Sequence, residues 1–104
     1  MLNYTFALRQ GRKTIPVVVF EDAAYHLAGE FLLAERGILS QIAAVLDADG
    51  DDSISGSAFT LEKRGALCVI TNDMTEKSLE LPTDDLRALT SDYRAEVKRL
   101  RKRQ

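Results

Sequence analysis

The chain of 104 residues has one cysteine, one histidine and no tryptophan, and it lacks any long apolar run. Cys68 alone cannot form an internal disulfide, which is typical of a protein kept in a reducing compartment. A lone cysteine and a lone histidine cannot close a tetrahedral zinc site. No stretch reaches the length of a membrane span, and the first residues lack the basic-then-apolar layout of a signal peptide. We therefore expect one cytoplasmic domain over residues 1–104, with no membrane contact.

Residues that could carry catalysis are equally scarce. His26 is the single imidazole, and its sequence neighbours supply neither a nucleophile nor an orienting carboxylate, although Glu30 could pair with it one helical turn later. Cys68 lies in an apolar segment without basic neighbours, which indicates a buried and unreactive thiol. Gly11 and Gly65 stand alone in expected turns, so no glycine-rich phosphate loop is present. We predict a protein that is not an enzyme and holds no cofactor.

The net charge of −2 hides an uneven distribution. Residues 98–104 contain five positive side chains and no negative ones, and the other 97 residues carry 9 basic and 16 acidic side chains, a net charge of −7. A body this acidic repels nucleic-acid phosphate and favours a basic protein partner. The basic run complements the dipole at the end of a helix, an interpretation that we favour over a contact with nucleic acid.

Hydrophobic periodicity predicts two strands and a long helix in the first half. Residues 2–9 alternate between apolar and polar side chains, as a half-buried strand does, and residues 14–20 are predicted to return beside them in a hairpin. Pro16 cannot donate to a ladder, so the second strand should lie at a sheet edge. Apolar residues recur at helical spacing over residues 22–46, which predicts one core helix with a kink near Gly37.

The second half predicts three strands and a final helix. Residues 57–63 and 66–72 form a hairpin around Gly65, and a short strand covers residues 77–81. Thr83 is the predicted N-cap of the last helix. The order β-β-α-β-β-β-α predicts an α+β domain, with a mostly antiparallel sheet of four to five strands and both helices on one face.

Four carboxylates occupy six positions after the long helix, namely Asp47, Asp49, Asp51 and Asp52. Residues 47–58 resemble part of the calcium loop of an EF-hand, with Asp at loop positions 1, 3 and 5 and Ser at positions 7 and 9. Asp52 replaces the glycine of position 6, and Ala58 replaces the bidentate glutamate of position 12. We therefore expect no physiological metal site, and any calcium affinity should be millimolar or weaker.

The small size, the acidic body, the α+β layout and the clustered aspartates resemble the immunity proteins that neutralise bacterial nuclease toxins, such as those of contact-dependent growth inhibition systems. The resemblance implies a cytoplasmic inhibitor that presents carboxylates to the basic cleft of a toxin, in place of phosphates. The candidate partner-binding residues come from the acidic segment and the later strands: Asp47, Asp49, Asp51, Asp52, Glu62, Glu76 and Glu80.

Two alternatives stay open. A homodimeric secretion chaperone is also small, acidic and α+β, and the apolar strand over residues 14–20 suits strand addition by an extended partner. A calcium-binding protein with a single loop is the other alternative. Both a monomer and a homodimer are compatible with the sequence, because the apolar edge at residues 17–19 could pair between protomers.

Overall fold

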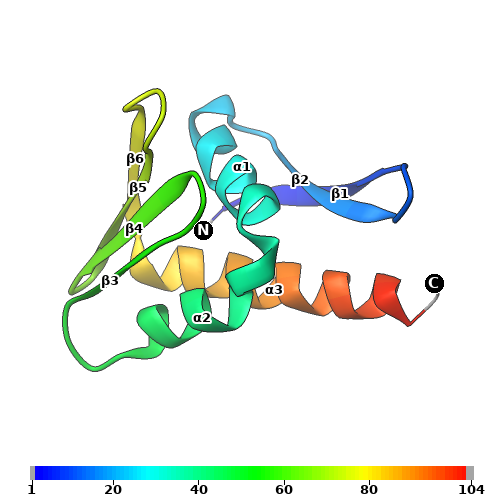
Figure 1. Ribbon diagram of the computed structural model, residues 1–104. Helices are drawn as coiled ribbons and strands as arrows, with labels where there is room; N and C mark the ends of the chain where they lie inside the picture. Colours follow the sequence, from blue (N-terminus) through cyan, green and yellow to red (C-terminus); the bar gives the residue numbers. More distant parts are fainter. Residues whose placement is uncertain (1, 103–104) are drawn as a thin grey trace.

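The computed structural model describes residues 2–102, which form two antiparallel sheets with helices packed between them (Figure 1). In chain order the elements are β1 (Tyr4–Arg9), β2 (Ile15–Phe20), the 3-10 helix η1 (Ala23–Tyr25), α1 (His26–Ala34), the 3-10 helix η2 (Arg36–Ile38), α2 (Leu39–Asp47), β3 (Asp52–Ser55), β4 (Phe59–Arg64), β5 (Leu67–Asn72), β6 (Ser78–Pro82) and α3 (Thr83–Arg101). The predicted α+β class is confirmed.

The strands divide between two sheets, where the sequence suggested one. One sheet is the hairpin β1-β2, and the other has the order β3-β4-β5-β6. The outer edge of β2 is covered, because the Tyr93 hydroxyl donates to the Pro16 carbonyl over 2.8 Å and α1 packs its Gly29 against Val18. Pro16 has no N–H to offer on that edge.

The predicted long helix is two α-helices in the structure. Asp22 accepts a hydrogen bond from the Ala24 N–H at the start of η1, and α1 then ends at Ala34. The chain passes through η2 before α2 begins in a different direction (Figure 1). The break lies at Gly37, where the sequence predicted only a kink.

The core lies between the helices and the inner face of the four-stranded sheet. Phe31 on α1 is 1% exposed, as the sequence predicted for the centre of the apolar stripe. Its ring lies 5.8 Å from that of Phe59 on β4. The other large side chains that are fully buried come from the three α-helices and the four-stranded sheet: Leu32, Ile42, Leu46, Leu61, Cys68, Ile70, Leu81, Leu86, Leu89, Thr90 and Tyr93. Within residues 2–102, no helix has the length and apolar character needed to cross a bilayer.

The prediction that Thr83 caps α3 with its side chain is wrong. Thr83 is the first residue of the helix and is buried, and its hydroxyl donates to the Gly65 carbonyl over 2.9 Å. Pro82 occupies the cap position instead. The hydroxyl therefore fastens α3 to the β4–β5 turn rather than to its own first turn.

Candidate functional site

The C-terminal end of α2 is joined to α3 by an arginine. The Arg87 Nε atom lies 3.1 Å from the Asp47 carboxylate, and its Nη2 atom donates to the Leu46 carbonyl over 2.6 Å. Arg87 also pairs with Asp84, one turn earlier on its own helix. A cation at this position offsets the partial negative charge of the last carbonyls of α2. Asp47 is therefore held by an internal ion pair, although its side chain remains exposed.

The next three aspartates lie together at one end of the molecule, which we call the acidic end and define as Asp49, Asp51 and Asp52. All three residues are exposed. The Asp51 carboxylate accepts a hydrogen bond of 2.9 Å from the Gly65 N–H, and the Asp52 carboxylate accepts one of 2.8 Å from the Ser53 N–H. The Asp51 bond fastens the loop to the β4–β5 turn, whereas the Asp52 bond is local to the start of β3. No cation among residues 2–102 forms an ion pair with the acidic end.

The segment that resembles a calcium loop adopts a different structure. The residues at loop positions 6 to 9 form the edge strand β3, and the chain continues into β4 rather than into a second helix. Asp47 turns to Arg87, Asp51 turns to Gly65, and Ala58 donates its N–H to a glutamate elsewhere. Among the described residues, no three His, Cys, Asp or Glu side chains are gathered in a way that could hold a metal ion.

Two further candidate residues share one row of the larger sheet, on the face turned away from the helices. In the strand register Glu62 lies opposite Val69, and Val69 lies opposite Glu80. Two strand spacings separate the carboxylates of this row by about 10 Å at the backbone. Glu62 pairs with Arg64 over 2.7 Å, and Leu67 on the same face is 44% exposed. We call this side of the larger sheet, which carries Glu62, Arg64, Leu67, Val69 and Glu80, the open face (Figure 1).

Glu76 lies apart from the other candidates. It sits in the β5–β6 turn with a φ angle of 64°, at the end of the sheet opposite to the β4–β5 turn. The six residues of β5 separate the two turns by about 20 Å. The structure therefore brings the acidic end close to the open face, and it leaves Glu76 outside this surface.

A buried carboxylate that the sequence interpretation missed organises the β3–β4 turn. Glu35 is 4% exposed, and its side chain accepts four hydrogen bonds. Three come from the backbone N–H groups of Ser57, Ala58 and Phe59, over 2.9 to 3.0 Å, and one comes from the Ser57 hydroxyl over 3.1 Å. A Cβ atom on Gly56 would lie 2.3 Å from the carboxylate, so the turn requires glycine there. Glu35 thus holds the larger sheet against the end of α1.

Two opposing effects set the ionisation of Glu35. Desolvation by burial raises the pKa of the carboxyl, but the hydrogen bonds from Ala58, Ser57 and Phe59 outweigh it, and the pKa lies below its ordinary value. One signal in the sequence could have found this residue. Glu35 stands four residues after Phe31 and four before Leu39, in phase with the buried stripe of the helices.

The single histidine and the single cysteine lie on different elements, His26 at the start of α1 and Cys68 on β5. His26 is exposed and lies 3.3 Å from Glu30, the partner that its spacing suggested. Cys68 is fully buried, with its sulfur 3.3 Å from the Thr83 hydroxyl, and burial raises the pKa of its thiol. The prediction of a buried thiol is confirmed.

Comparison with known proteins adds no assignment, since no protein-family model, curated protein or solved structure matches this chain.

Proposed function

We propose that this protein is a binding protein rather than an enzyme, and that it inhibits a basic protein partner in the bacterial cytoplasm as an immunity protein inhibits a nuclease toxin. The observation that carries the proposal is the position of the acidic end beside the open face. Asp49, Asp51 and Asp52 are exposed, Asp51 and Asp52 accept backbone hydrogen bonds, and none of the three forms an ion pair with a cation among residues 2–102. The surface is complete within one chain, so the proposal holds for a monomer and for a homodimer.

The two parts of this surface suit two stages of binding. Exposed, negatively charged carboxylates attract a cationic cleft toward the protein and raise the association rate at low salt. The apolar side chains of Leu67 and Val69 lie near the turn that Asp51 holds, and their burial against a partner would slow dissociation. Glu62 and Glu80 flank Val69 on the open face; Arg64 pairs with Glu62 there, so Glu80 is the carboxylate that adds negative charge to this face.

The contacts at β2 weigh against the alternative of a secretion chaperone. Strand addition needs an edge with unpaired backbone groups. At β2 the Pro16 carbonyl already accepts the Tyr93 hydroxyl, and Gly29 of α1 packs against the Val18 carbonyl. The outer edge of β2 therefore has few unpaired backbone groups to which an extended partner could add a strand. This favours the inhibitor over the secretion chaperone.

The test replaces Asp49, Asp51 and Asp52 together by Asn, which removes three charges and keeps an acceptor oxygen for Gly65 and Ser53. The candidate partner is the product of the neighbouring gene, because an immunity gene follows its toxin gene. We expect the association rate to fall by roughly 10-fold at low salt, and the salt dependence of binding to flatten. Stopped-flow or interferometry measures the rate, and a nuclease assay measures inhibition.

A matched variant removes three charges elsewhere, by Glu21→Gln, Glu30→Gln and Asp92→Asn. These residues lie around β2, α1 and α3, away from the acidic end. We expect this control to bind the partner within about 2-fold of the wild type, because screened charges outside the contact change the rate little. If the two variants lose the same amount of association rate, only net charge matters and the acidic end is not the contact surface.

A further inference from the structure

We infer that a cationic pocket between the β1–β2 turn, η2 and the end of α3 binds a small organic phosphate of nucleotide size. The cavity has a volume of about 460 Å³, within the range of sites for small ligands. Three cations line it, namely Lys13, Arg36 and Arg101, and its apolar wall is formed by Ile15, Pro16 and Val97. The inference is independent of the acidic end and of the proposed inhibitor function.

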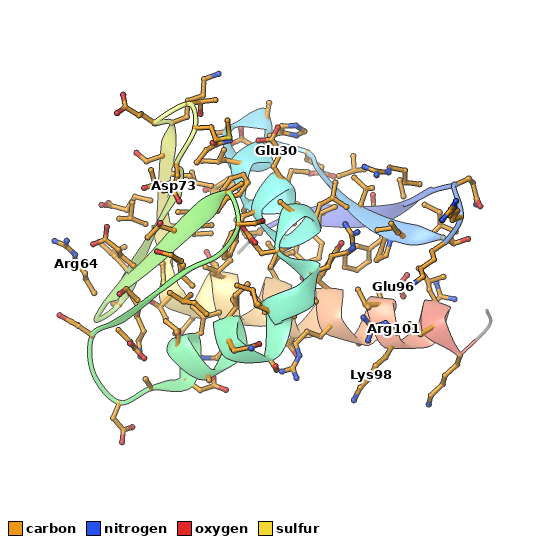
Figure 2. All side chains as sticks on the ribbon, viewed as in Figure 1. Glu30, Arg64, Asp73, Glu96, Lys98 and Arg101 are labelled. Atoms are coloured by element: carbon orange, nitrogen blue, oxygen red, sulfur yellow. The ribbon has the colours of Figure 1, made fainter. Side chains whose placement is uncertain are left out.

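The cations of this pocket lack carboxylate partners within residues 2–102. Arg64 and Arg87, on the other side of the molecule, each form an ion pair. Lys13, Arg36 and Arg101 form none, and the acid nearest in sequence to Arg101 on α3, Glu96, is held by Arg99 through two bonds of 2.8 Å. Figure 2 shows Glu96 and Arg101 on the C-terminal half of α3, far from Arg64. A cluster of unpaired cations around a cavity is a site for an anion.

One of these cations is held in place before any ligand arrives. The Arg36 guanidinium donates to the Leu33 carbonyl at the end of α1. Burial raises the pKa of the Tyr93 phenol to about 12, and the positive charge of Arg36 offsets part of that rise. One edge of the guanidinium is bound to the Leu33 carbonyl, so the N–H groups of its other edge remain available to a phosphate. Because the side chain is already ordered, it loses less conformational entropy when a ligand binds.

An adjoining cationic hollow and the apolar wall of the pocket together indicate the class of ligand. A second hollow of about 200 Å³ shares Arg36, Val97 and Arg101 with the pocket, and it adds Arg94 and Lys98. A chain of phosphates can extend along this shared cationic wall, while an apolar or aromatic body lies against Ile15 and Pro16. We therefore assign a nucleoside di- or triphosphate as the class of ligand. A long nucleic acid fits less well, since the acidic remainder of the chain would repel its backbone.

Calorimetry with ATP, inorganic triphosphate and adenosine tests the inference at physiological salt. We expect ATP to bind, triphosphate to bind at least ~10-fold more weakly because it leaves the apolar wall uncovered, and adenosine to bind undetectably. The variant Lys13→Gln/Arg101→Gln should weaken ATP binding ~100-fold, since each of the two lost charge-assisted hydrogen bonds costs about a factor of 10. The matched variant Arg64→Gln/Lys77→Gln, on the opposite side, should stay within about 2-fold of the wild type.

A further variant checks the position of the phosphates without touching the first pocket. Arg94→Gln/Lys98→Gln should weaken ATP more than AMP, because only the longer chain reaches the second hollow. Equal affinity for ATP and triphosphate would overturn the inference, as would equal losses in the pocket variant and its matched control. An absence of ATP binding at millimolar concentration would overturn it too. Single-stranded RNA that binds more tightly than ATP and competes with it would replace the small ligand by a polynucleotide.

Discussion

Removing the buried carboxylate of Glu35 should destabilise the fold more than any other single change to an acidic residue. The substitution Glu35→Ala leaves the N–H groups of Ala58 and Phe59 without their acceptor, and Phe59 is buried. Ser57 is exposed, so water can replace the carboxylate for its two donors. An unsatisfied buried donor costs about 1–3 kcal/mol, and the lost charge-assisted bonds add to this. We expect the free energy of unfolding to fall by about 3–5 kcal/mol.

Denaturant unfolding measures this change, with two companion variants. Glu35→Gln keeps the shape and one acceptor oxygen but turns an amide toward the same donors, so its cost should be intermediate, about 1–3 kcal/mol. Glu30→Ala, on the exposed side of α1, should change stability by less than about 0.5 kcal/mol. Each kcal/mol lost should lower the melting temperature by roughly 4–8 °C for a domain of this size.

The role of Glu35 should also appear in the pH dependence of the free energy of unfolding. The pKa of Glu35 is lower in the folded protein than in the unfolded chain, so the unfolded state binds more protons as the pH falls. The stabilisation is fully present above the unfolded pKa of about 4.3 and is lost as the pH falls through the folded pKa. Glu35→Gln should therefore flatten the acid limb of the stability curve, whereas Glu30→Ala should leave it as steep as in the wild type.

Two results would refute this reasoning. A loss below about 1 kcal/mol for Glu35→Ala would mean that water satisfies all the donors and that the carboxylate does not hold the turn. An unchanged acid limb in Glu35→Gln would mean that other carboxylates set the acid stability.

Two further predictions concern the same core. Gly56→Ala should cost about 2–3 kcal/mol in the wild type, because its Cβ displaces the Glu35 carboxylate, but much less in the Glu35→Ala background, and a double-mutant cycle measures this coupling. Additive losses would show that the methyl group clashes with something else. Phe31→Ala should cost ~3–5 kcal/mol, since Phe31 is fully buried against Phe59, and a loss under ~1 kcal/mol in denaturant melts would contradict that packing.

Strands with a regular pattern could be predicted from the sequence alone. β1, β2, β4, β5 and β6 fall within two residues of the expected segments, because alternation or an apolar run bounded by turns marks each of them. β3 could not be predicted in this way. Its four residues include one apolar side chain, Ile54, and it becomes a strand only because β4 offers it an edge.

Some residues of the candidate site could likewise be identified from the sequence, and others could not. The aspartates of the acidic end could be identified because they are neighbours in the sequence, and the structure keeps them together. Glu35 was missed because a charged residue within an apolar stripe is read as a break in the hydrophobic pattern rather than as a buried, hydrogen-bonded carboxylate. Its three backbone donors lie more than 20 residues later and are not visible in the sequence. The pocket cations lie at positions 13, 36 and 101, so only folding brings them together.

Charge placement, rather than net charge, sets what each end of this molecule can attract. The net charge of −2 describes neither end, because the loop between α2 and β3, which carries the acidic end, and the C-terminal end of α3, which carries Arg101 of the pocket, lie at opposite ends of the molecule (Figure 1). Electrostatic interactions between exposed charges decay over about 8 Å at physiological ionic strength, and the shortest axis of the molecule spans 26 Å. Each end therefore acts on its surroundings almost independently of the other. We therefore expect the basic partner proposed for the acidic end and the phosphate ligand proposed for the cationic pocket to bind without displacing each other.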